Sequence, residues 1–150
     1  MIIYIGADHR GFKLKEKLRD FLKERGYPVF DLGADSYEAS DDYPDFAHAV
    51  AKKVAEAPED SRGILICGTG AGVDIVANKV RGVRSVLASN IVQATRSKND
   101  DNTNVISLGA ELLTEEEAES ILMAWLDASF SGEDRHVRRL KKIGDIESGA

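Results

Sequence analysis

A short apolar run of this chain leads directly into a glycine-rich turn and then into a helix-like stretch. The run is Gly63-Ile64-Leu65-Ile66, the turn is Cys67-Gly68-Thr69-Gly70-Ala71-Gly72, and the helix-like stretch covers residues 73–79. The glycines let the backbone approach a ligand closely and leave amide N–H groups at the start of a helix, where an anion or a thiolate is favoured. The only cysteine of the chain therefore stands at a strand-to-helix turn, where α/β proteins carry out chemistry.

The same alternation of apolar runs and helical periods continues along the whole chain. We expect five strands, near residues 2–6, 28–32, 63–67, 84–88 and 104–108. Between and after them we expect helices from Phe12 to an end at Gly26, over about 44–57, 72–80 and 90–99, from a capping box at Thr114, and in a tail at about 132–145. This order predicts one α/β domain over residues 1–150, a Rossmann-like, doubly wound sheet of five parallel strands with helices on both faces.

The composition is ordinary for a globular protein, with 43% hydrophobic and 31% charged residues. No apolar run approaches the roughly 20 residues of a membrane span, and the chain opens on a strand-like run without the pattern of a signal peptide. One cysteine cannot form an internal disulfide. We therefore expect a cytoplasmic protein with no membrane partner, and the net charge of −6 argues against nucleic acid.

Ligands of doubly wound sheets bind beyond the carboxyl ends of the strands, and those ends carry the candidate residues. Asp8 and His9 follow the first strand and could contact a hydroxylated or phosphorylated ligand, although Asp8 could instead be the N-cap of the next helix. Cys67 follows the third strand and could be a base or a nucleophile, or simply a small buried core residue.

The loop after Cys67 matches neither common nucleotide motif. The third glycine of a dinucleotide fingerprint would fall at Val73, and no Gly-Lys-Ser/Thr sequence of a P-loop follows. What remains is a compact cradle suited to a phosphate, a carboxylate or an enediolate oxygen.

A basic cluster near the C-terminus is a second candidate for anion binding. Arg135 and Arg139, with His136 between them, are four residues apart and would share one face of a helix, where they could clamp a phosphate. The alternative is a solvated basic tail. Trp125 is expected in the core or in a subunit interface.

Several motifs together resemble the type B ribose-5-phosphate isomerase family, which also includes the subunits of galactose-6-phosphate isomerase. Their order and spacing match over almost the whole chain. The motifs are Gly6-Ala7-Asp8-His9, Asp42-Tyr43-Pro44-Asp45, Cys67-Gly68-Thr69-Gly70-Ala71-Gly72, Ala77-Asn78-Lys79 with Gly82-Val83-Arg84, Asn104-Val105 before Leu108-Gly109, and Arg135-His136 with Arg139.

The resemblance implies a metal-free, cofactor-free aldose–ketose isomerisation of a sugar phosphate through a cis-enediolate. Cys67 would be the base, and Thr69 with the amides of Gly68, Gly70 and Gly72 would hold the shifting oxygens. Asp8 and Tyr43 would contact sugar hydroxyls or help to open the ring. The positions that would bind phosphate are His9, Arg135, His136 and Arg139, with the arginines reaching across from a neighbouring subunit, so that a homodimer or higher homo-oligomer would share each active site.

The chain departs from the family pattern at two places. A His-Asn-Asp-Ala-Asn run of the family is Asp100-Asp101-Asn102-Thr103-Asn104 here, so Asp100 takes the place of the ring-opening histidine and Asp101 is expected among the substrate-binding residues. A carboxylate can act as a general base, but at neutral pH it is a poorer acid. Glu111 stands where many members place an arginine near the phosphate, and it would oppose that anion unless it points away or pairs with a basic residue.

Ribose 5-phosphate is the substrate we expect first. If the chain is an enzyme, allose 6-phosphate and galactose 6-phosphate are the alternative substrates. If it is not an enzyme, the alternative function is a non-catalytic subunit that binds a sugar phosphate. Retention of Cys67 and Thr69 argues against a pure binder, because binding alone has no evident need for a thiol.

Overall fold

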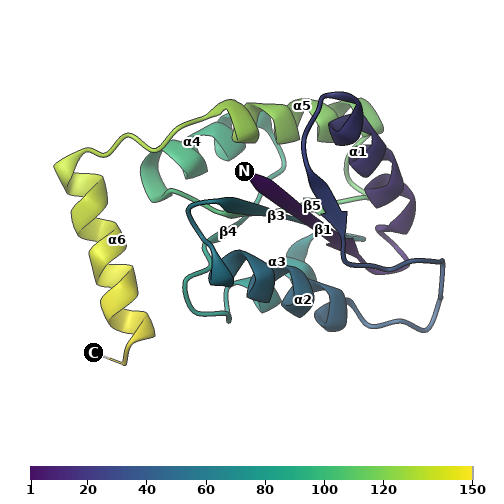
Figure 1. Ribbon diagram of the computed structural model, residues 1–150, viewed down its shortest axis with the longest axis horizontal. Helices are drawn as coiled ribbons and strands as arrows, with labels where there is room; N and C mark the ends of the chain where they lie inside the picture. The colour runs from purple at the N-terminus through teal and green to yellow at the C-terminus, as the bar shows by residue number, and fades with distance from the viewer. Residues whose placement is uncertain (150) are drawn as a thin grey trace.

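The computed structural model describes residues 1–149 and contains a single five-stranded parallel sheet (Figure 1). Its strands are β1 (Ile2–Ala7), β2 (Val29–Asp31), β3 (Ser61–Cys67), β4 (Ser85–Leu87) and β5 (Val105–Gly109), in the spatial order β2-β1-β3-β5-β4. All four neighbouring pairs are parallel. The five strands expected from the sequence are present, and the predicted fold class is confirmed.

Helices cover both faces of the sheet. They are α1 (Phe12–Glu24), α2 (Tyr43–Glu56), α3 (Ala71–Ala77), α4 (Ile91–Asp101), α5 (Glu115–Asp127) and α6 (Asp134–Glu147). Helices α1, α4 and α5 pack together over one face, while α2 and α3 pack over the other. The apolar sides of these five helices are therefore buried toward the sheet, as expected for a doubly wound fold.

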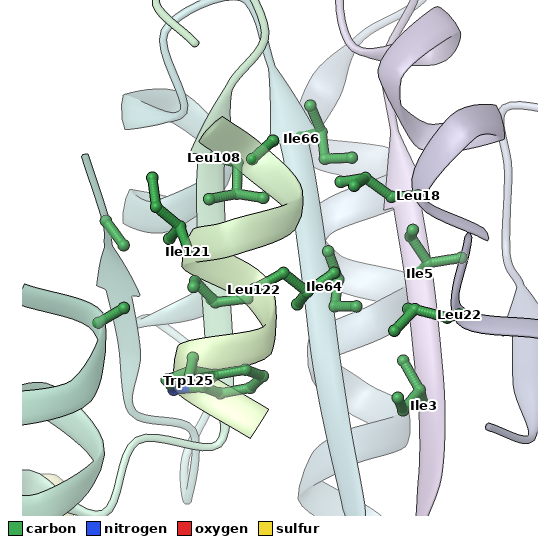
Figure 2. Close-up of a cluster of buried hydrophobic side chains, with 14 of the residues drawn as sticks. Ile3, Ile5, Leu18, Leu22, Ile64, Ile66, Leu108, Ile121, Leu122 and Trp125 are labelled. Carbon is green, nitrogen blue, oxygen red and sulfur yellow. The ribbon is translucent and has the colours of Figure 1, made fainter. Parts of the chain in front are cut away.

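The larger core lies between the sheet and the pair α1 and α5 (Figure 2). Its fully buried side chains include Ile5 and Ile64 from the strands and Leu18 and Leu122 from the helices. Burying each such side chain contributes about 1.5–3 kcal/mol. Trp125 is 1% exposed in this core, and its indole N–H donates to Thr103 Oγ1 at 2.8 Å. Within one chain this tryptophan is thus a core residue.

Local sequence signals fix two of the helix ends. Gly26, at φ +83°, ends α1, and Tyr27 N–H donates back to the carbonyl of Leu22, which satisfies a carbonyl at the end of the helix. Thr114 and Glu117 form the capping box that was expected at the start of α5.

Helix α6 extends beyond the sheet (Figure 1), and its last residue, Glu147, accepts the N–H of Gly82 in the loop after α3 at 3.2 Å. Its nearest neighbour is α4, and it lies beyond the amino ends of the strands. The tail helix expected near 132–145 runs from Asp134 to Glu147, and three of its apolar side chains, Val137, Ile143 and Ile146, are exposed. Among residues 1–149 no helix is both long enough and apolar enough to cross a membrane.

The strand order brings the ends of β1 and β3 together. From β1 the chain winds to β2 on one side and, through α2, to β3 on the other, so the winding direction reverses between β1 and β3. At such a point the loops on either side diverge and leave a crevice at the carboxyl edge. The residues after Ala7 and after Cys67 therefore lie at the edge where a ligand is expected.

Candidate active site

Cys67 ends β3 and is 5% exposed. Its Sγ accepts a hydrogen bond from the main-chain N–H of Gly70 at 3.1 Å. The thiolate is the form of cysteine that acts as a base, and its sulfur can accept a hydrogen bond from a main-chain N–H. The family resemblance assigns the amides of Gly68, Gly70 and Gly72 to the substrate oxygens, and this stays a prediction. In the structure, the Gly70 amide donates to the sulfur.

The turn after Cys67 depends on Gly70. This residue has φ +79°, and a Cβ there would lie 2.6 Å from Leu87 Cδ1. A side chain would therefore be strained by the backbone conformation and would also collide with β4. The tight turn is what lets the Gly70 amide fold back onto the sulfur.

Asp8 and His9 lie at the end of β1. Asp8 is 4% exposed, and its Oδ1 accepts the N–H of Gly11 at 3.0 Å. Because α1 begins at Phe12 with Gly11 as its N-cap, Asp8 is not the N-cap but holds the turn that precedes the helix.

Asp41, in the segment between β2 and α2, holds the ring of His9. Nδ1 of His9 lies 2.7 Å from Asp41 Oδ1, and the main-chain N–H of His9 donates to the same oxygen at 3.0 Å. Tyr37 packs edge-on against the ring, at 5.9 Å between centroids. We did not single out Asp41 in the sequence, since no periodicity or motif spacing distinguishes it from the other acidic residues before Tyr43.

Asp8, His9 and Asp41 form the group in residues 1–149 that could hold a metal ion. Their potential ligand atoms all lie within 4.8 Å of one another. Imidazole and carboxylate groups are ordinary metal ligands. The expectation of a metal-free reaction stays a prediction.

Tyr43 comes to the Cys67 turn from the first residue of α2. A Cβ on Gly72 would lie only 2.7 Å from Cζ of this tyrosine, so the phenol ring packs directly on the glycine. Tyr43 is 39% exposed, which leaves its edge accessible to a ligand. The structure thus brings Asp8, His9, Tyr43 and Cys67 to one edge of the sheet.

Thr69 is exposed at the same edge. It lines a cavity of about 240 Å³ between the ends of β4 and β5, together with Leu87, Ser89, Gln93 and Leu112 among others. Its Oγ1 accepts the N–H of Ala71 at 3.4 Å, a long contact that leaves the hydroxyl able to bind a ligand.

Glu111 does not act as an isolated negative charge. Its carboxylate binds the guanidinium of Arg10 through two hydrogen bonds, Nε to Oε1 at 2.7 Å and Nη2 to Oε2 at 2.6 Å. The hydrogen bonding and the charge of Glu111 raise the pKa of Arg10. Of the two possibilities considered for Glu111, pairing with a basic residue is the one observed. Arg10 was missed, because its partner is 101 residues away in the chain.

The remaining predicted site residues lie at the opposite edge of the sheet. Asp100 precedes β5, whose first residue Val105 pairs with Gly63, whereas Cys67 pairs with Gly109 at the far end. His136 is 4% exposed; its Nδ1 lies 2.5 Å from Ser131 Oγ and its Nε2 lies 3.7 Å from Asp100 Oδ1.

The other three members of this second group are closer to solvent. Arg135 pairs with Glu133 at 2.9 Å, Arg139 is exposed on the same helix, and Asp101 borders a cavity of about 380 Å³ beside α6. Within one chain the second group (Asp100, Asp101, Arg135, His136 and Arg139) is therefore not assembled with Cys67.

A family model described as ribose/galactose isomerase matches residues 3–143. The chain belongs to this family. It is 43% identical to ribose-5-phosphate isomerase B of Escherichia coli over 145 residues, which cover 97% of this chain and 95% of the relative. The crystal structure of ribose-5-phosphate isomerase B from Mycoplasma genitalium with bound ribulose-5-phosphate superposes with a TM-score of 0.96 at 42% identity, covering 99% of this chain and 97% of that one.

The ribose/galactose isomerases that resemble this chain do not all bear the same substrate name. The D-erythrulose-4-phosphate isomerase of Pectobacterium atrosepticum is 39% identical over 145 residues, which cover 97% of this chain and 94% of the relative. The family resemblance inferred from the sequence motifs is thus confirmed. In this ribose/galactose isomerase the carboxyl edge brings together a thiol, hydroxyls and main-chain amides. Groups of these kinds can take a proton next to a carbonyl and stabilise the charge that develops on its oxygen.

Proposed function

We propose that this chain interconverts ribose 5-phosphate and ribulose 5-phosphate. The observation that carries the proposal is the thiol of Cys67, which lies at the carboxyl edge with its sulfur hydrogen-bonded to the Gly70 amide, in a chain of the ribose/galactose isomerase family. The ribulose-5-phosphate in the structure of the Mycoplasma genitalium relative supports this choice of substrate.

In the proposed reaction Cys67 acts as the base. Its thiolate takes the proton from C2 of the open-chain aldose, which gives a cis-enediolate, and the same proton returns to C1 while the hydroxyl proton moves from O2 to O1. The Thr69 hydroxyl and the amides of Gly68, Gly70 and Gly72 stabilise the charge that develops on these oxygens. Asp8 and Tyr43 bind the sugar hydroxyls from the other side of the turn.

We propose that two copies of the chain complete each site. His9 of one copy binds the phosphate from the carboxyl edge, and Arg135, His136 and Arg139 of the other copy bind it from α6. Asp100 of that second copy acts as the base in ring opening, and Asp101 contacts the sugar. The separation of the two groups of residues supports this arrangement, since one chain cannot close around a single small substrate with both.

The position of α6 supports the same arrangement. It extends beyond the sheet and exposes Val137, Ile143 and Ile146, so that a second copy can cover apolar surface that the chain itself leaves open. A homodimer is the smallest assembly that satisfies the proposal. A cytoplasmic location fits an enzyme of sugar-phosphate metabolism and belongs to the same proposal.

A tetrose phosphate is a second candidate substrate, because a relative of almost the same length is named a D-erythrulose-4-phosphate isomerase. Allose 6-phosphate and galactose 6-phosphate are further candidate substrates, because the family resemblance also allows a hexose 6-phosphate. Asp100, which stands where the family resemblance places a ring-opening histidine, is the reason to test these other sugars. A binding subunit without turnover is the non-enzymatic alternative.

The experiment is an isomerase assay of the purified protein without added metal. Ribose 5-phosphate, D-erythrulose 4-phosphate, allose 6-phosphate and galactose 6-phosphate are compared, with Cys67→Ala and Cys67→Ser as controls. We expect turnover of ribose 5-phosphate to exceed that of the others and to fall at least a thousandfold in Cys67→Ala, with ligand binding within a few-fold of the parent. A near-normal rate in Cys67→Ala would remove the thiol from the mechanism, and binding without turnover of any sugar would identify a binding subunit.

A further inference from the structure

The loop after β5 is joined to the turn that carries Cys67. The N–H of Ala110 donates to the carbonyl of Cys67 at 2.9 Å, and the N–H of Glu111 donates to the carbonyl of Gly68 at 2.9 Å. These bonds continue the pairing of Cys67 with Gly109 beyond the ends of the strands. The main chain of residue 111 is therefore fixed directly beside the residue that follows the thiol.

The side chain of Arg10 closes the same turn from its other side. A Cβ on Gly68 would lie 2.7 Å from both Cζ and Nε of Arg10, so the flat guanidinium rests on the glycine. The carboxylate of Glu111 holds the guanidinium there with its two hydrogen bonds. Gly68 is thus enclosed by Arg10 on its Cα and by Glu111 at its carbonyl.

The ion pair of Arg10 and Glu111 is expected to add little to the stability of the folded chain. Arg10 and Glu111 are 52% and 47% exposed, and exposed ion pairs contribute about 0–1 kcal/mol to folding. Both charges nevertheless lie beside the reactive turn. The guanidinium that rests on Gly68 is a cation beside the residue that follows Cys67, and a nearby cation makes a cysteine more reactive.

We propose that Arg10 and Glu111 are positioning residues for Cys67. This inference rests on the proposed role of Cys67 as the base. Arg10 favours the thiolate and packs the Cys67–Gly68 turn into shape, and Glu111 orients the guanidinium and offsets part of its charge. The two residues therefore act on the thiol with opposite electrostatic sign although they share one ion pair.

Because the two charges are opposite, their removal should change the reactivity of Cys67 in opposite directions. A pair that only supported the structure would not produce opposite changes. Arg10→Gln leaves the charge of Glu111 beside the turn and is expected to slow the reaction of Cys67 with iodoacetamide at pH 7 by about three- to tenfold. Glu111→Gln leaves Arg10 uncompensated and is expected to accelerate it by a similar factor. Because the chain has one cysteine, the mass of the intact protein reports this thiol alone.

Arg10→Lys separates charge from shape. It keeps the cation but not the planar, two-bond contact, so the alkylation rate is expected to stay within about twofold of the parent while turnover of ribose 5-phosphate falls. The matched control is Glu56→Gln, which breaks the similarly exposed pair of Lys53 and Glu56 on α2. Glu56→Gln should change neither the alkylation rate of Cys67 nor the turnover of ribose 5-phosphate.

Changes of the same sign in Arg10→Gln and Glu111→Gln, or alkylation rates within twofold of the parent in both, would overturn the proposal. Circular dichroism and thermal unfolding confirm that each variant is folded before it is compared. The alkylation measurement needs no substrate, so its result does not depend on whether the protein turns over ribose 5-phosphate in the isomerase assay. In the active enzyme the acidic limb of the kcat/KM profile should move to lower pH in Glu111→Gln and to higher pH in Arg10→Gln.

Discussion

One oxygen of Asp41 binds His9 twice: it accepts the main-chain N–H at 3.0 Å and lies 2.7 Å from Nδ1 of the ring. This double contact fixes both the position of the residue and the rotation of its imidazole, and it directs Nε2 away from Asp41. The side chain of Asp41 is only 11% exposed, so the contact is largely shielded from solvent. If His9 binds the phosphate as proposed, a ring that is already held in this way loses less rotational freedom on binding.

Asp41→Asn should therefore weaken binding of the sugar phosphate more than it affects the chemical step. We expect KM to rise about three- to tenfold with kcat within about threefold, because the amide still contacts the ring but no longer provides a charge. Steady-state kinetics measure the two parameters separately. Asp42→Asn is the matched control, since Asp42 caps α2 without a side-chain hydrogen bond. Equal losses in both variants would assign the effect to the loop and not to His9.

Arg139→Ala should also act on binding. If Arg139 makes a charge-assisted hydrogen bond to phosphate in the neighbouring site, its loss costs about 1.5–3 kcal/mol. Isothermal titration with ribose 5-phosphate in the Cys67→Ala background measures this directly. Arg138→Ala, which removes a neighbouring exposed arginine of α6, controls for net charge. Unchanged affinity in Arg139→Ala would identify the basic cluster as a solvated tail.

Mixing two inactive variants tests the shared site. Cys67→Ala and Asp100→Asn remove groups from opposite edges of the sheet, so a mixed dimer has one site with both defects and one with neither. When equal amounts are unfolded and refolded together, about half of the dimers are mixed, and about a quarter of the parental activity should return. Refolding each variant alone is the control. No recovery, with mixed dimers demonstrated by mass spectrometry, would place both residues of a site in one chain.

Lys98 should make the stability of the protein depend on pH. Its side chain is 6% exposed, and burial, assisted by Arg62 and Arg84, lowers its pKa to about 8. In the unfolded chain the lysine has its ordinary value near 10.5, so between pH 8 and 10.5 only the unfolded chain holds the proton. The contribution of Lys98 to the free energy of unfolding therefore increases as pH rises through this window, and the full penalty for burying the charge is present below pH 8.

Urea unfolding of the parent and of Lys98→Met between pH 7 and 10 measures this effect. The parent should gain about 2–3 kcal/mol relative to the variant over this range. Below pH 8 the sign of the difference depends on Asn102 and Thr103, whose oxygens accept hydrogen bonds from Lys98 and would lose their donor. Lys52→Met, at an exposed position, should show no such trend. A difference between parent and Lys98→Met that is constant with pH would contradict the lowered pKa.

The sequence by itself determined the elements and the place of the thiol. Apolar runs of strand length alternate with helical periods, and this local pattern was enough to predict the five strands, the helix end at Gly26 and the capping box at Thr114. The glycine-rich turn likewise located Cys67 at the carboxyl end of β3. These features could be predicted because each depends on residues that are close together in the chain.

Only the tertiary structure decided which of the candidate residues meet. The order β2-β1-β3-β5-β4 and the pairing of Cys67 with Gly109 bring Glu111 to Gly68 and to Arg10. The same sheet separates Asp100 and His136 from Cys67, and the segment after β2 folds back to place Asp41 on His9. These relations join residues that are 32 to 101 positions apart or lie across the whole sheet. No local pattern encodes them, because strand order and register are set by packing of the complete core.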